Sequence, residues 1–204
     1  MPSKIVLFLI ALVLCGVFYT WLNKRSVRKA NEQFGWMAEE LGVEMIAGSK
    51  KGEGAEYPQL KGQIEGVDFD MYVKYSNNKM YPDQIIAVFQ LSNIEGEMKI
   101  LPSRPLQKPS IPTGIKDFDK SFKVYSNRTD WIPHIFTPSL TQGFVALQKK
   151  GLMDESRFIL EKSELRYERN LVIKSSKDAR ELFEEIEVAK NLVIHLSKKH
   201  PSLN

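Results

Sequence analysis

Cysteine is almost absent from this chain, and the position of the one that is present removes several kinds of chemistry. That residue, Cys15, lies within a long apolar run near the N-terminus. The remainder of the chain therefore has no thiol that could form a disulfide, ligate zinc or act as a nucleophile. Cys15 follows Leu14 and precedes further apolar residues, whereas the lipid-bearing cysteine of a lipoprotein follows a small residue and precedes polar sequence.

Histidine and recognisable catalytic motifs are also scarce. Two of the three histidines, His195 and His200, are five residues apart and do not share a helical face, so they cannot form a helical zinc pair. The sequence contains no nucleophile elbow, dinucleotide-binding fingerprint, kinase signature or zinc-ligand spacing. We therefore predict no metal and no cofactor. These absences favour a non-enzymatic role, although an active site assembled from distant residues stays open.

Neither sign of charge dominates the chain. It has 29 basic and 25 acidic residues, a formal net charge of +4. Four of the basic residues follow the apolar run directly: Lys24, Arg25, Arg28 and Lys29. Elsewhere the two signs nearly balance, which argues against the basic stripe of a nucleic-acid-binding protein.

What the chain does contain is an uncharged apolar run over residues 5–22. As a helix it would be about 27 Å long, close to the thickness of a bilayer's hydrocarbon core. A cleaved signal peptide would need more positive charge before the run than Lys4 supplies, and small residues at a cleavage site. Tyr19 and Trp21 lie near the end of the run, where aromatic rings suit the headgroup region. We predict a short tail over residues 1–4 and an uncleaved signal anchor over 5–22, as in a single-pass bacterial membrane protein.

The basic cluster predicts the orientation of this anchor. Lys24, Arg25, Arg28 and Lys29 outweigh Lys4 and the amino terminus, and positive flanks stay on the cytoplasmic side. An inner-membrane protein whose domain faces the cytoplasm is therefore expected, with reversed topology and an extracytoplasmic domain as the alternative. The cluster could also contact anionic headgroups, at about 1 kcal/mol per residue, but setting the topology is the simpler role.

The rest of the chain predicts an α+β fold with a mainly antiparallel sheet. Residues 23–42 hold the basic cluster and an amphipathic helix over 26–41, which Gly42 ends. Alternating apolar residues flank a turn at Glu65 and Gly66, and the apolar segment 84–91 predicts a central strand. Further strands are expected over 97–101, 121–125, 157–161, 164–169 and 171–174, and further helices over 139–150 and 176–199.

The last helix predicts how the domain is layered. One broad apolar face indicates that it covers one side of the sheet. Its glutamates are expected to form a solvated face: Glu181, Glu184, Glu185 and Glu187. The domain spans residues 55–204, and the proline-rich stretch 102–112 either crosses one domain or joins two halves.

Four residues form the predicted ligand or partner patch: Trp36, Trp131, His134 and Phe136. Trp36 lies opposite the apolar face of its helix, and the others belong to an aromatic loop over 131–138. His134 and the nearby Asp130 are the most plausible polar groups for an enzyme.

Two functional hypotheses follow. The leading one is a binding or assembly module for a protein partner, held at the membrane surface by one span, where tethering raises the local concentration of partners. The second is a membrane-tethered enzyme acting on an envelope or lipid-linked substrate.

Overall fold

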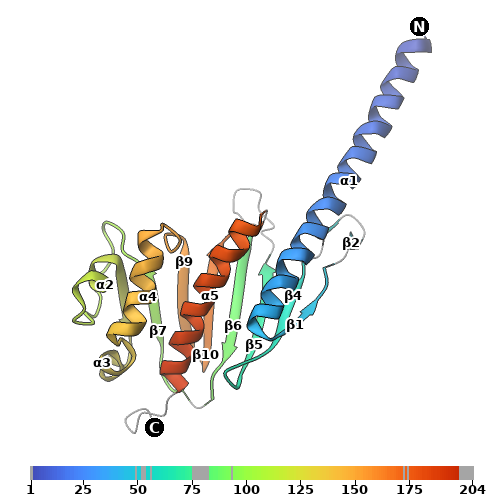
Figure 1. Ribbon diagram of the computed structural model, residues 1–204. Coiled ribbons are helices and arrows are strands. Elements are labelled where there is room, and N and C mark those ends of the chain that lie inside the picture. Colours follow the sequence, from blue (N-terminus) through green and yellow to red (C-terminus); the bar gives the residue numbers. More distant parts are fainter. Residues whose placement is uncertain are drawn as a thin grey trace.

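The computed structural model describes residues 2–48, 50–51, 54–55, 57–74, 83–92, 94–171, 173 and 175–197 (Figure 1). Its helices are α1 (Pro2–Leu41), α2 (Lys116–Ser121), the 3₁₀ turn η1 (Thr129–Trp131), α3 (Ile132–Ile135), α4 (Pro138–Lys149) and α5 (Ser176–Ser197). Its strands are β1 (Glu44–Ile46), β2 (Lys50–Lys51), β3 (Gly54–Ala55), β4 (Gln59–Ile64), β5 (Val67–Lys74), β6 (Gln84–Gln90), β7 (Met98–Pro102), β8 (Phe122–Ser126), β9 (Ser156–Glu161) and β10 (Glu164–Asn170).

Eight of the strands form one antiparallel sheet in the order β1-β4-β5-β6-β10-β9-β7-β8. This confirms the predicted α+β class with an antiparallel sheet and a C-terminal helix. The sheet takes strands from both sides of the proline-rich stretch 102–112, because β7 and β8 pair directly across it. The strands β2 and β3 form a separate two-stranded ribbon within the glycine-rich segment that follows β1.

The β4–β5 hairpin forms as the sequence predicts. Glu65 and Gly66 both have positive φ values, 52° and 75°, which match the right-handed twist of the two strands. Alternation then places Phe69 and Met71 in the core and Asp68 on the opposite, exposed face.

The strand β6 is central because both of its faces are apolar. Ile85 and Phe89 point towards the helices, whereas Ile86 and Val88 point to the other side of the sheet. Those two residues are nevertheless only 4% and 9% exposed. Arg166 and Glu168 of β10 flank Val88 and Ile86 in register, and the methylene stems of such side chains cover apolar surface.

The helices cover one face of this sheet (Figure 1). α5 lies across its centre, α4 and α2 lie towards β7 and β8, and the C-terminal half of α1 packs beside α5. A series of ring contacts runs through the core beneath them, from Phe118 through Phe144 and Phe158 to Tyr167, with centroid distances of 5.6, 4.9 and 5.2 Å. None of the helices in the described part of the chain lies on the opposite face of the sheet.

The first helix is longer than the sequence pattern suggests. α1 is continuous from Pro2 to Leu41, so the predicted anchor segment and the predicted amphipathic helix are one element. Its C-terminal half packs against the domain through the buried side chains of Ala30, Phe34 and Met37. Gly42, at φ 69°, ends the helix. None of the helices in the described part of the chain combines the length and the apolar character that crossing a bilayer requires.

Two other expectations differ from the structure. The aromatic segment 131–138 is not a loop, because η1 and α3 occupy most of it. A strand over 171–174 is not found: Leu171 and Ile173 lie in no strand, and residues 172 and 174 lie outside the described residues.

Candidate functional site

The uncovered face of the sheet, here called the open face, presents alternate residues of every long strand. In β9, Arg157, Ile159 and Glu161 point to this face, whereas Phe158 and Leu160 point to the helices. Ion pairs connect its charged side chains, both across strands, with Lys61–Asp70 at 3.6 Å and Lys99–Glu161 at 2.8 Å, and within β10, with Arg166–Glu168 at 2.7 Å.

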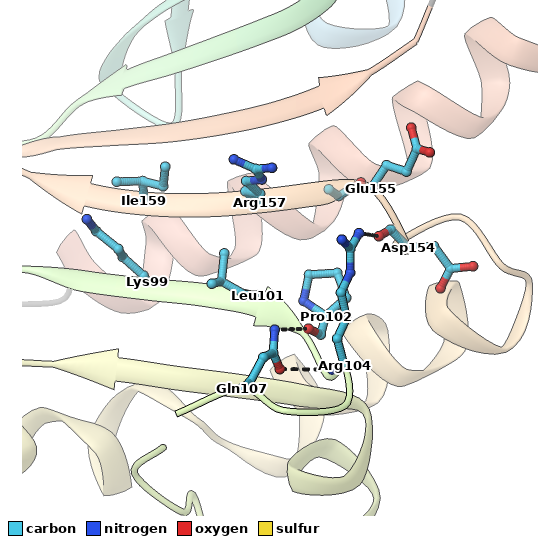
Figure 2. Close-up of a pocket in the computed structure, with 10 residues that line it drawn as sticks. Lys99, Leu101, Pro102, Arg104, Gln107, Asp154, Glu155, Arg157 and Ile159 are labelled. Carbon is cyan, nitrogen blue, oxygen red and sulfur yellow. Dashed lines mark hydrogen bonds between the residues drawn. The ribbon is translucent and has the colours of Figure 1, made fainter. Parts of the chain in front are cut away.

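A pocket of about 290 Å³ opens on this face between β7, β9 and the loop that follows β7 (Figure 2). We call it the β7–β9 pocket. Leu101, Pro102 and Ile159 supply its apolar surface. Its complete lining is Lys99, Leu101, Pro102, Arg104, Gln107, Asp154, Glu155, Ser156, Arg157 and Ile159.

Three cations line this pocket, and they differ in how far they are neutralised. Lys99 pairs with Glu161. Arg104 donates from Nη2 to the main-chain carbonyl of Asp154 at 2.9 Å, which orients the guanidinium without cancelling its charge. Arg157 is exposed and makes no ion pair or hydrogen bond with the described part of the chain. The pocket therefore contains an uncompensated guanidinium beside an oriented one.

The acidic residues of the lining leave this excess positive charge in place. The Asp154 carboxylate accepts a hydrogen bond from Gln148 Nε2 at 2.6 Å, on the helix side of the chain. In Figure 2 the carboxylates of Asp154 and Glu155 point away from the centre of the pocket. Glu168, opposite Arg157 in the β9–β10 register, is already paired with Arg166.

The loop after β7 forms the outer wall of the pocket, and a side chain holds its shape. Gln107 accepts from the backbone N–H of Arg104 at 2.8 Å and donates to the Pro102 carbonyl at 3.0 Å (Figure 2). The tip residue Leu106 is fully exposed and has φ 63°, a left-handed conformation that costs a leucine roughly 1–2 kcal/mol.

A second polar cluster lies in the core under α5, beneath the other face of the same strands. The Glu185 carboxylate is completely buried. Its Oε2 accepts from Ser156 Oγ at 2.6 Å and from the Tyr167 hydroxyl, and its Oε1 accepts from Arg169 Nη1. Arg169 also lies 3.8 Å from Glu181.

Burial dominates the protonation of this cluster. It raises the pKa of the Glu185 carboxyl to about 7, against the opposing effects of Arg169, Ser156 and Tyr167, which favour the charged form. Burial also raises the pKa of the Tyr167 hydroxyl well above its ordinary value. The pKa of the Glu185 carboxyl is therefore close to neutral pH, but the group is buried and has no contact with solvent.

The prediction that Glu185 belongs to a solvated face is wrong. Glu185 lies on the buried stripe of α5, in the 3–4–3–4 spacing that continues through Leu182, Ala189, Leu192 and Leu196. That spacing indicates from the sequence that Glu185 is buried. Its hydrogen-bond partners on β9 and β10 offset the energetic cost of burying the carboxyl group.

The structure does not bring the predicted patch residues together. Trp131 and Phe136 are 1% and 3% exposed, so they belong to the core and cannot form a surface patch. Gly96 explains the depth of Trp131, because the indole ring occupies the space that a side chain at residue 96 would need. Trp36 packs against Phe183 of α5 with a centroid distance of 5.4 Å. His134 is exposed on α3.

Asp130 is not arranged as a general acid or base. Arg128 donates to both of its carboxylate oxygens, at 3.0 and 2.9 Å. These hydrogen bonds lower the pKa of the Asp130 carboxyl, and His134 adds a smaller electrostatic contribution in the same direction. Neither Asp130 nor His134 lines the β7–β9 pocket. In the described part of the chain, no three His, Cys, Asp or Glu side chains are grouped so that they could hold a metal ion.

The predicted topology cluster lies along α1. Arg25, Arg28 and Lys29 are exposed, and Arg28 pairs with Glu32 at 3.6 Å. The side chain of Lys24 lies outside those that the structure describes.

Sequence reasoning missed the β7–β9 pocket. A weak signal was present, because Arg157 and Ile159 alternate with buried residues in β9. Lys99 and Leu101, which lie beside Arg157 and Ile159 in the sheet, come almost 60 residues earlier in the sequence. Only the pairing of β7 with β9 brings these four residues together.

The chain was compared with protein families, curated sequences and solved structures. No protein-family model matches the chain, and no curated protein sequence matches it. Among solved structures, the chain is similar to the crystal structure of the mycobacterial trehalose monomycolate transport factor A, TtfA. The two align with a TM-score of 0.43 and 12% identity, over 79% of this chain and 96% of that chain. Nothing is inferred about this chain from a similarity so distant.

Proposed function

We propose that this protein is a binding or assembly module held at a membrane surface by residues 5–22. The observation that carries the binding role is the asymmetry of its sheet. Among the described residues, helices and the apolar core cover one face, whereas the other has a pocket whose lining includes three basic and three apolar side chains. A face of this kind is suited to contact with a partner or ligand.

The lining of the β7–β9 pocket favours binding over catalysis. Its cations, Lys99, Arg104 and Arg157, are groups that hold anions and cannot readily remove a proton at neutral pH. The hydroxyl of Ser156 points into the core and is bound to Glu185. The Asp154 carboxylate is bound to Gln148.

The membrane attachment is supported by the sequence of the first helix. Residues 5–22 carry no charge, and the basic residues that follow them favour a cytoplasmic domain. The N-terminal half of α1 projects beyond the end of the sheet at which β9 begins and β7 ends (Figure 1). Attachment through that half would hold the β7–β9 pocket at the membrane-facing end of the domain.

Fractionation of cells expressing the full chain with a C-terminal tag tests the attachment. We expect the protein to stay in the membrane pellet after alkaline carbonate extraction, and a variant lacking residues 2–22 to leave it. Recovery of the intact protein in the soluble fraction would overturn the anchor.

Protease treatment of intact and lysed spheroplasts tests the orientation. Protection until lysis supports a cytoplasmic domain. Digestion in intact spheroplasts would overturn that orientation and favour an extracytoplasmic domain.

Site-specific photo-crosslinking tests the binding role of the open face. A photoreactive residue is placed at Lys61, on the open face, and as a matched control at Arg180, an exposed residue on α5. We expect a discrete adduct from residue 61 and none from residue 180. Equal labelling from both, or none from residue 61, would contradict an open-face partner.

A further inference from the structure

We infer that the β7–β9 pocket binds the phosphate group of an anionic amphiphile, with the phosphate at Arg157 and Arg104 and the adjoining carbons against Leu101, Pro102 and Ile159. This inference deepens the proposed function and rests on its assignment of the open face as the binding surface. It names the chemical class of the ligand.

The charge argument rests on the two arginines. A guanidinium presents donors in a fixed fork that fits two oxygens of a phosphate. Arg157 has all of its donors unused within the described part of the chain, and Arg104 uses one Nη2 bond to the Asp154 carbonyl. In Figure 2 the Arg157 side chain extends from β9 and the Arg104 side chain from the loop after β7. The nearby carboxylates are paired elsewhere or point away, so an incoming anion would not have to displace one.

The apolar surface and the size of the pocket limit what accompanies the phosphate. Leu101, Pro102 and Ile159 supply the apolar part of the lining beside the arginines. The volume of about 290 Å³ is at the lower end of ligand pockets. It has room for a headgroup and the first carbons of a chain, but not for a whole lipid.

The loop tip gives an independent reason to expect an amphiphile. Leu106 is held fully exposed in a left-handed backbone conformation, next to Pro105 and two residues before Lys108. Glycine or asparagine would occupy this conformation with less strain. An exposed, strained leucine flanked by Arg104 and Lys108 is suited to inserting among acyl chains while its neighbours contact phosphates.

Isothermal titration of the full chain in a non-ionic detergent tests this assignment. The probes are dihexanoyl phosphatidylglycerol, dihexanoyl phosphatidylcholine and inorganic phosphate. The variants are Arg157→Gln, which removes the unused guanidinium, and Arg180→Gln, which removes the same charge from the helix-covered side. We expect phosphatidylglycerol to bind in preference to phosphatidylcholine. Arg157→Gln should weaken that binding at least about tenfold, and Arg180→Gln should leave it unchanged.

The probes separate the two sources of phosphate. Binding of inorganic phosphate as tight as that of phosphatidylglycerol, lost in Arg157→Gln, would support the oxyanion site and identify a free phosphate as its ligand. Equal affinity for phosphatidylglycerol and phosphatidylcholine would overturn the inference. An equal effect of Arg157→Gln and Arg180→Gln would overturn it as well.

Leu106→Asn tests the apolar component without straining the loop. It keeps a residue that tolerates positive φ and removes the exposed leucine. We expect it to weaken phosphatidylglycerol binding several-fold and to leave phosphate binding unchanged. A loss of both would place the leucine in the anion site itself and contradict the division of roles. Because these titrations do not depend on the anchor, a failure of the membrane fractionation would leave their result intact.

Discussion

Replacing Glu185 by Gln should make the stability of this protein much less dependent on pH. The carboxyl group is completely buried among Ser156, Tyr167 and Arg169, and burial raises its pKa from an ordinary value of 4.5 to about 7. Gln has nearly the same shape but no ionisation, so the substitution removes the titration while largely preserving the packing.

The direction of the effect follows from proton linkage. Between about pH 4.5 and pH 7 the folded protein retains a proton on Glu185 that the unfolded chain releases. The contribution of this group to the free energy of unfolding is therefore fully present below pH 4.5 and is lost as the pH rises through about 7. At about 1.4 kcal/mol per pH unit, the loss amounts to roughly 3 kcal/mol.

Urea unfolding of the full chain in a non-ionic detergent, followed by tryptophan fluorescence between pH 5 and pH 8, measures this change. We expect wild type and Glu185→Gln to have similar stability near pH 5. At pH 8 the variant should be the more stable by up to roughly 3 kcal/mol. Glu187→Gln is the matched control, because Glu187 lies on the same helix, is partly exposed and pairs with Lys190. It should follow the wild-type pH profile.

The opposite profile would refute this reasoning. If Arg169 held the carboxylate ionised at every pH tested, wild-type stability would stay level or rise between pH 5 and pH 8. Glu185→Gln would then be destabilised by about 3–5 kcal/mol at neutral pH, as expected when a buried ion pair loses one partner. Such a result would mean that the ion pair outweighs burial in this cluster.

Three further substitutions test the packing, each read as a change in the urea or thermal unfolding midpoint. Gly96→Ala should destabilise the domain by about 1–3 kcal/mol, because its Cβ would lie 2.3 Å from Cη2 of Trp131; an unchanged midpoint would show that the indole ring can move. Trp36→Ala should cost about 2 kcal/mol by removing the contact with Phe183 that holds α1 against α5, whereas Trp36→Phe should retain most of the stability. Thr137→Ala should cost about 1 kcal/mol, because the Thr137 hydroxyl caps the first turn of α4; no loss would mean that solvent caps the helix equally well.

Local sequence patterns were sufficient to predict those helices and strands whose periodicity and end signals lie within one segment of the chain. The β4–β5 hairpin follows from strict alternation around Glu65 and Gly66. The central position of β6 follows from its apolar load on both faces, and the amphipathic face of α5 predicts a helix that covers the sheet. In each case the residues that decide the structure are neighbours in the sequence, so no knowledge of the rest of the chain is needed.

Tertiary structure alone decided which polar and aromatic side chains are inside and which are available. Trp131 is buried because Gly96, 35 residues earlier, leaves room for its ring. Glu185 is buried because β9 and β10 supply a hydroxyl, a phenol and a guanidinium at the point where α5 crosses them. Arg157 and Lys99 share a pocket because β7 and β9 pair out of sequence order. The sequence by itself determined the periodicities, and with them the secondary structure and the apolar faces, whereas the candidate site arose from the packing of segments far apart in the chain.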